Sequence, residues 1–222
     1  MKKVPNVTAT DVAIILGLNP YQTVYELLEQ KVENKHQFVG NKFTEHGSRY
    51  ESVAVEVYEN TTGNTVERKQ KNSKHPEISY LSGRLDGITN VLLDEVDGSK
   101  KRKVDKRCII EVKCPLKENR EELPLTVENM PKYYWVQCQV YMDMFDCDVV
   151  DYIEFYIKPN DVKENGKLYH VHVPRDKTWW ENEAIPKIKI FYDEMKRYCT
   201  LGSLETHPVR QAEKQWLLNI FS

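Results

Sequence analysis

The sequence lacks the features that mark membrane and secreted proteins. No apolar run approaches the 18 residues that a membrane-spanning helix needs. The early apolar run Val12 to Leu18 is short, follows Asp11 and has no cleavage site, so it does not fit a signal peptide. The chain also has no internal repeat and no low-complexity segment. We therefore expect an intracellular globular protein without a membrane partner.

Metal-binding and disulfide patterns are also missing. The five cysteines are odd in number and include no CxxC pair or zinc-finger spacing, which favours reduced thiols and no structural zinc. The six histidines show no spacing typical of metal ligands, so the sequence assigns them no role.

A large excess of charge of either sign is absent too. The formal net charge is -2, charged residues make up 30% of the chain, and the mean hydropathy of -0.64 is ordinary for a globular protein. Any positive surface for nucleic acid must therefore be local. With 222 residues the chain fits one domain, 1–222. We divide it into an N-terminal helical platform (1–40), a catalytic core (41–175) and C-terminal helices (176–222).

The most informative stretch is Cys108-Ile109-Ile110-Glu111-Val112-Lys113-Cys114-Pro115, which is preceded by Asp86. The two-residue period of a strand places Ile109, Glu111 and Lys113 on one face, and Pro115 ends the pairing. This predicts one core face and one face that carries chemistry. Carboxylates are hard ligands for Mg²⁺, and a lysine ammonium group can orient or help deprotonate water and offset phosphate charge. The pattern is that of a magnesium-dependent phosphodiesterase.

Other segments place further polar residues near this stretch. Capping patterns predict a helix after Thr8 or Thr10 and a second helix that begins after Thr23. A helix from 43 to 58 has Glu51 on its apolar stripe, and a helix from 132 to 145 sets Gln137 and Tyr141 on one side. Strands are expected at 65–69, 79–90, 91–96, 106–114, 149–158 and 167–173, and helices at 177–198 and 208–221.

This order of motifs resembles the PD-(D/E)xK nuclease superfamily, and within it the lambda-type exonucleases and YqaJ-like viral recombinases. The resemblance spans residues 8 to 141. It rests on Thr8-Ala9-Thr10-Asp11, Gly47-Ser48-Arg49-Tyr50-Glu51, Ser82-Gly83-Arg84-Leu85-Asp86-Gly87, Glu111-Val112-Lys113-Cys114-Pro115 and Gln137-Cys138-Gln139-Val140-Tyr141. It implies an α/β fold with a restriction-endonuclease-like core, in which helices flank a mixed central sheet.

The resemblance also assigns roles to individual residues. Asp86, Glu111 and the main-chain carbonyl of Val112 become metal ligands, and Glu51 a ligand to a second or water-linked ion. Lys113 positions the attacking water. Gln137 or Gln139, with Tyr141 as a secondary candidate, contacts that water or the phosphate. The implied cofactor is Mg²⁺, bound as two ions and replaceable by Mn²⁺.

A pocket for a 5′-phosphate is implied near the N-terminus. Thr10 would offer the start of a helix, whose free N–H groups favour an anion. Lys3 stands where the family has arginine, and a lysine cannot bind phosphate through two N–H groups as the guanidinium of arginine does. Arg84 stands where the family has a small hydroxyl residue, and either Arg84 or Arg120 could compensate.

The resemblance implies a 5′-to-3′ exonuclease on double-stranded DNA ends that exposes a 3′ single strand for an annealing protein. It also implies that the chain can assemble as a homotrimer. A structure-specific or restriction-like endonuclease and an inactive DNA-binding protein stay open as alternatives. Each site residue also has a plain structural alternative. Asp86-Gly87 can be a turn, Glu111 and Lys113 a solvated strand face, Glu51 a partner of Arg49 or Arg84, and Gln137 a surface amide.

The basic run Lys100 to Lys103 is predicted to form the tip of a turn. It can contact DNA, act with Val104 as a nuclear import signal, or be merely solvated. The compartment is accordingly expected to be the cytoplasm, or the nucleus if this run is an import signal.

Overall fold

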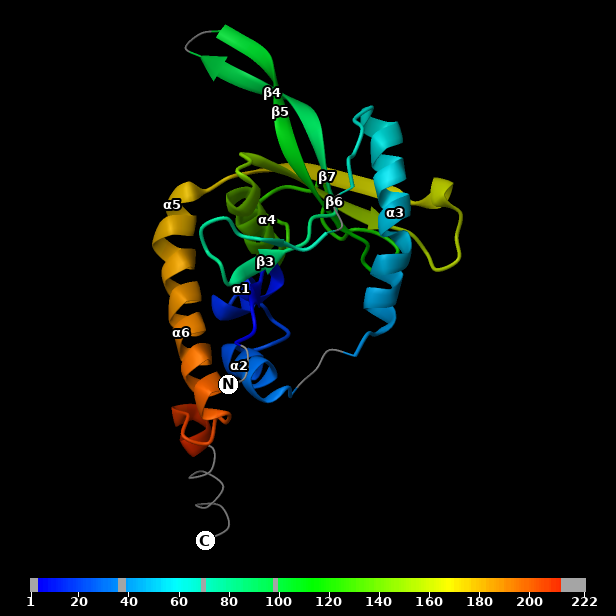
Figure 1. Ribbon diagram of the computed structural model, residues 1–222. Coiled ribbons are helices and arrows are strands. Elements are labelled where there is room, and N and C mark those ends of the chain that lie inside the picture. The colour runs from blue at the N-terminus through cyan, green and yellow to red at the C-terminus, as the bar shows by residue number, and fades with distance from the viewer. Residues whose placement is uncertain (1–3, 36–38, 69–70, 98–99, 213–222) are drawn as a thin grey trace.

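The computed structural model describes residues 4–35, 39–68, 71–97 and 100–212 and has a mixed α/β architecture (Figure 1). It contains one three-stranded and one four-stranded sheet among the described residues, with helices on both sides of the larger one. The predicted mixed central sheet flanked by helices is therefore confirmed. Lys3 lies outside the described residues.

The larger sheet has the strand order β4-β5-β6-β7. The strands are β4 (Gly87–Asp97), β5 (Lys100–Lys113), β6 (Val149–Tyr156) and β7 (Lys167–Pro174). Among the described strands of this sheet, only β5 and β6 run parallel to each other. The chain must therefore cross over between them, and α4 (Lys132–Phe145) lies in that crossover. The expected helix after Pro131 and the last two expected strands are confirmed.

Both faces of β5 are covered, so the face that carries Glu111 is not the solvated strand face that was left open as an alternative. Ile110 and Val112 pack against α3 (Lys42–Thr62), whereas Ile109 shares a core with residues of α4. Glu111, on the α4 side, is only 1% exposed. The physical reason is that a strand in a parallel pair is usually covered on both faces, so alternation does not bring one face to solvent.

The N-terminal helices join the small sheet to α4. β1 (Val7–Thr8) pairs in parallel with β3 (Leu81–Gly83), and β2 (Ser73–Lys74) pairs with the other side of β3. α1 (Ala9–Ile15) follows β1 directly and packs on α4, and α2 (Val24–Glu33) packs on α1. The caps behave as predicted. Thr8 precedes α1 as its N-cap, and the Thr23 hydroxyl accepts the Glu26 N–H at 3.2 Å.

The segment that contains Asp86 differs from the prediction. The expected strand 79–90 is interrupted at 84–86, where the chain leaves β3 of the small sheet and enters β4 of the large one. Arg84 and Asp86 therefore do not share a strand face. The expected strand at 65–69 is reduced to a single bridge between Glu67 and Ile88.

The basic run also differs from the prediction, because Lys100 to Lys103 belong to β5 and not to a turn. β4 and β5 form a long hairpin that extends away from the rest of the molecule (Figure 1). Its register sets Lys103 opposite Asp94. Opposite charges across a strand pair favour the pairing and weaken the positive field beyond the hairpin. Import signalling stays a prediction.

The C-terminal part wraps along the N-terminal helices. The predicted helix 177–198 is divided into α5 (Lys177–Trp179), a wide π-helical turn (Trp180–Ala184) and α6 (Ile185–Leu201), which contacts α1 and α2. Residues 208–212 are helical, and the rest of the expected 208–221 helix lies outside the described residues. In the described ranges, no helix combines the length and the apolar character that crossing a membrane requires.

Candidate active site

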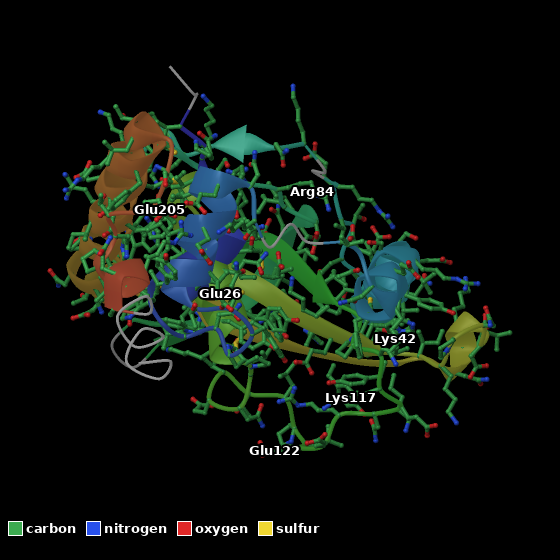
Figure 2. All side chains as sticks on the ribbon, turned by 90° about the horizontal axis from the view of Figure 1, so that it is seen from below. Glu26, Lys42, Arg84, Lys117, Glu122 and Glu205 are labelled. Carbon is green, nitrogen blue, oxygen red and sulfur yellow. The ribbon has the colours of Figure 1, made fainter. Side chains whose placement is uncertain are left out.

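The predicted catalytic residues meet in one cleft of about 1470 Å³. Arg84, between β3 and β4, and Lys117 and Glu122, on the connection between β5 and α4, belong to its lining (Figure 2). The cleft is also lined by every predicted catalytic and metal residue, namely Glu51, Asp86, Glu111, Val112, Lys113 and Gln137, and by Tyr141, Thr10 and Arg120. Gln139 is not part of this lining.

Asp86 lies beside Glu111 because Gly87, which follows Asp86, pairs with Ile110, which precedes Glu111. The Asp86 Oδ2 atom accepts the Val112 N–H at 2.8 Å, which fixes this carboxylate beside the strand. The Glu111 Oε2 atom is buried and accepts no hydrogen bond from any residue that the structure describes. Burial raises the pKa of the Glu111 carboxyl to about 8, the Lys113 ammonium opposes this shift, and Asp86 and Glu51 add to it.

This arrangement fits a divalent cation. A buried carboxylate oxygen without a partner is costly, and a second carboxylate nearby increases the repulsion. A hard cation would relieve both effects, and Asp86, Glu111 and Glu51 offer the oxygen donors that Mg²⁺ prefers. Val112 lines the cleft as well, which is consistent with the predicted contact between its main-chain carbonyl and the metal ion.

Lys113 is held on the same side of β5 as Glu111. Its Nζ atom donates to Glu111 Oε1 and lies 4.7 Å from the centre of the Tyr134 ring. Burial lowers the pKa of Lys113, but the carboxylates of Glu111 and Asp86 outweigh burial and hold this pKa above its usual value. Before any metal binds, these carboxylates favour the ammonium form of Lys113, which is suited to orient water and balance charge.

A hydrogen-bond chain connects α4 to the segment that precedes Asp86. The Gln137 Nε2 atom donates to the Tyr141 hydroxyl at 3.0 Å, and this hydroxyl donates to the Arg84 carbonyl at 2.9 Å. Burial raises the pKa of Tyr141, so the hydroxyl keeps the proton that this bond needs. Gln139 instead donates to the Pro174 carbonyl at 3.0 Å and accepts the Asp176 N–H at 2.7 Å. Of the two glutamines, the fold brings only Gln137 to the cleft.

The residues predicted for a 5′-phosphate are only partly available. Thr10 and the exposed Arg84 line the cleft. At the start of α1, however, the Thr8 N–H already donates to Asp11 at 2.7 Å, so part of this helix end is satisfied by a carboxylate. Arg120 is tied down as well, since its nitrogens donate to Glu154, to the Glu122 carbonyl and to Asn129. The phosphate-binding role stays a prediction for Thr10, Arg84 and Arg120.

Sequence reasoning missed two groups. Tyr21, Tyr133 and Tyr134 line the cleft and lie in edge or tilted contact with one another, at ring distances of 5.9 and 4.3 Å. His170 and His172 meet Asp151 on the other face of the sheet. The two-residue spacing of these histidines, which puts both on one side of a strand, was the available signal.

Comparison with known proteins decides the family. The YqaJ-like viral recombinase domain matches residues 2–148. The chain belongs to this family. The match covers the motifs around Glu51, Asp86, Glu111 and Gln137, and the predicted family resemblance is confirmed.

Two relatives of the YqaJ-like chain come from a virus and a bacterium. An uncharacterised protein of Acanthamoeba polyphaga mimivirus is 25% identical over 166 residues, 74% of this chain. The uncharacterised YqaJ protein of Bacillus subtilis is 27% identical over 134 residues, 60% of this chain. The matched parts span only 29% and 37% of these two proteins.

Solved structures show the same fold. An alkaline exonuclease from Laribacter hongkongensis superposes with a TM-score of 0.61 at 19% identity and covers 96% of this chain and 95% of its own. A phage-related exonuclease from Haemophilus somnus gives a TM-score of 0.57 at 20% identity, over 89% and 94% of the two chains. The PD-(D/E)xK-type fold expected from the sequence is therefore confirmed.

Proposed function

We propose that this YqaJ-family chain is a Mg²⁺-dependent exonuclease that degrades duplex DNA from its ends in the 5′-to-3′ direction. The observation that carries the proposal is the buried Glu111 Oε2 atom, for which the described residues provide no hydrogen-bond partner and which lies in the same cleft as Asp86, Lys113 and Gln137. The family and the exonuclease neighbours support a DNA substrate.

The roles follow from the contacts. Asp86 and Glu111 would hold Mg²⁺, with Glu51 near a second ion. The bound ions would activate water and balance charge on the attacking and leaving oxygens. Lys113 orients the attacking water through its ammonium group, which Glu111 and the Tyr134 ring hold in place. Gln137 is anchored by Tyr141 and presents its amide to the cleft.

The lining of the cleft explains why the metal also matters for binding DNA. Six carboxylates and five cationic side chains line it, so the cleft without metal offers phosphate no net attraction. Metal ions on the acidic residues would reverse this balance and make duplex DNA an acceptable ligand. A 3′ single strand would be the product, and a single-strand annealing protein is the proposed partner.

A digestion series with Mg²⁺ tests the proposal. The substrates are linear duplex with 5′-phosphate, the same duplex with 5′-hydroxyl, a covalently closed circle and a single strand, each carrying a label that reports which end is shortened. We expect release of nucleotides from 5′ ends, faster with the phosphate, and intact circles. Ca²⁺ is expected to permit binding with little cleavage, because its longer and looser coordination positions water poorly.

Other outcomes would assign a different function. Rapid cutting of closed circles would indicate the endonuclease alternative, and shortening from the 3′ end would reverse the proposed polarity. Metal-independent binding of DNA without any cleavage would indicate an inactive DNA-binding protein.

A further inference from the structure

A second cluster of ligand-type side chains lies on the opposite face of the large sheet from Glu111. Asp151 of β6 is in register with Ile110, one residue before Glu111, so the two carboxylates point to opposite faces. On β7, His172 stands opposite Asp151, and His170 lies two residues away on the same face. Potential ligand atoms of the three side chains all lie within 4.8 Å of one another.

The three residues are arranged around the buried carboxylate. His170 Nδ1 lies 2.9 Å from Asp151 Oδ1 and 3.1 Å from Oδ2, and His172 Nε2 lies 3.4 Å from Oδ2. Asp151 is 0% exposed, whereas the two imidazoles are 35% and 38% exposed. The Asp151 carboxylate is therefore buried in the fold, and solvent reaches the cluster on the side of the two imidazole rings.

The carboxylate is also oriented by α3. The Tyr58 hydroxyl donates to Asp151 Oδ2 at 2.7 Å, and Asn64 Nδ2 donates to the Tyr58 hydroxyl at 3.1 Å. Metal ligands in proteins are typically held in this way by hydrogen bonds from residues behind them. Tyr58 lies two turns along α3 from Glu51, so the cluster and the cleft share a helix.

The spacing suits a small ion with three protein ligands. With metal–ligand bonds near 2.0–2.1 Å, neighbouring ligand atoms of a tetrahedral site are about 3.3 Å apart. The observed separations of 2.9 and 3.4 Å lie on either side of this value. Two imidazoles with one carboxylate, and a remaining position open to solvent, suit Zn²⁺, Co²⁺ or Ni²⁺ and do not suit Mg²⁺.

We propose that Asp151, His170 and His172 bind one transition-metal ion of the zinc type, at a site separate from the cleft. Binding would replace the imidazole hydrogen bonds to Asp151 by metal bonds and release any proton that they carry. It would join β6 to the edge strand β7 and, through Tyr58, to α3. The site does not depend on the proposed nuclease activity.

The test is metal binding by the whole chain after removal of bound metal, in saturating Mg²⁺, measured by equilibrium dialysis with Zn²⁺ and by the visible absorption spectrum with Co²⁺. We expect one equivalent of Zn²⁺ and the intense Co²⁺ bands of a four- or five-coordinate site. His172→Gln, a change at a partly exposed position, should weaken binding at least tenfold while circular dichroism stays unchanged. Glu111→Gln, which changes the other site, should leave Zn²⁺ binding as it was.

Three results would overturn the proposal. The first is no Zn²⁺ retained in the presence of Mg²⁺, and the second is equal affinity in the His172→Gln variant. In either case the cluster is only a buried carboxylate satisfied by hydrogen bonds. The third is loss of Zn²⁺ in Glu111→Gln, which would place the ion in the cleft.

Discussion

Glu111 is a buried carboxylate at a position where burial of its charge lowers the stability of the fold. One of its oxygens pairs with Lys113, and the other is buried and accepts no hydrogen bond within the described part of the chain. Asp86 and Glu51 lie close enough to raise its pKa. A carboxylate in such surroundings is typical of a functional site, where a bound cation stabilises its charge. At the residue scale, the predictions therefore concern binding of metal and catalysis.

Metal affinity should depend on pH through Glu111. Its pKa of about 8 means that a proton occupies the carboxyl below this pH, and Mg²⁺ must displace it. We expect affinity to increase by up to about tenfold per pH unit from pH 6 to 8 and to level off above, because one proton is released. Calorimetric titration with Mg²⁺ in the absence of DNA, at pH 6, 7, 8 and 9, measures this. A flat profile would show that the folded protein keeps Glu111 ionised.

Lys113→Ala should abolish most catalysis and leave binding of DNA in place. The ammonium acts on the reacting water, so we expect turnover to fall by at least about a hundredfold. The matched control is Lys117→Ala, which removes a lysine that also lines the cleft but pairs with Glu121 on the exposed rim. Its turnover should change only a few-fold. Equal losses in single-turnover assays of the two variants would mean that Lys113 contributes only charge to the cleft.

At the scale of elements, the site depends on how closely β3 approaches α4 and α1. A Cβ atom at Gly83 would lie 2.6 Å from Tyr141 Cε1 and 3.3 Å from Ala9 Cβ. The absent side chain lets the Tyr141 ring pack beside β3, where its hydroxyl reaches the Arg84 carbonyl. A glycine on a short strand therefore sets the distance between Gln137 and the segment of Asp86.

Gly83→Ala should disturb both stability and activity. Tyr141 is 3% exposed and cannot yield freely, so we expect a loss of about 1–3 kcal/mol in the free energy of unfolding. Turnover should fall as well, because Tyr141 anchors Gln137. Gly47→Ala is the control for stability. No atom of a described residue lies within 4 Å of a Cβ added there on α3, and alanine favours a helix over glycine by about 0.5–1 kcal/mol. Urea unfolding measures the free energy of unfolding of both variants. A similar loss in the two would contradict the close packing of Tyr141 against Gly83.

At the scale of the whole molecule, the two ends of the described chain are tied together by charge. Arg210 donates to Glu29 at 2.6 Å and to both oxygens of Glu33, at 2.8 and 2.9 Å. The Leu204 N–H also donates to Glu33, at 2.8 Å. These bonds hold the segment after α6 against α2, and so support the N-terminal helices that pack on α4.

The Arg210–Glu33 contact gives a prediction on stability against pH. The hydrogen bond from Arg210 lowers the pKa of Glu33 to about 2, against the opposing effect of burial. A lowered carboxyl pKa stabilises the fold above the unfolded value of about 4.5, and this contribution is lost as pH falls toward 2. Arg210→Gln should therefore cost about 1–2 kcal/mol at pH 7 and nothing near pH 2.

Thermal or denaturant unfolding of Arg210→Gln and the unchanged protein at pH 7, 4 and 2 measures how this loss of stability depends on pH. Lys189→Gln is the control, because its pair with Asp193 is exposed and should contribute less than about 0.5 kcal/mol at any pH. An Arg210→Gln effect that stays constant between pH 7 and 2 would contradict the role of the Glu33 charge.

The sequence by itself determined the local elements and the identity of the residues that gather in the cleft. Caps at Thr8 and Thr23, the helix after Pro131, and β6 and β7 follow from short-range rules, which act within a few residues. The motif order also predicted the family correctly, because the residues that carry chemistry keep their order along the chain whatever the loops between them do.

Tertiary structure decided what depends on contacts between distant segments. The expected strand is interrupted at 84–86 because β3 and β4 belong to different sheets. Burial of Glu111 requires α4 over one face of β5, and alternation within the strand does not show that cover. The hairpin register that opposes Lys103 to Asp94, and the meeting of Asp151 with His170, are pairings across strands. Local propensity does not encode such pairings, because register is set by which faces the rest of the fold buries.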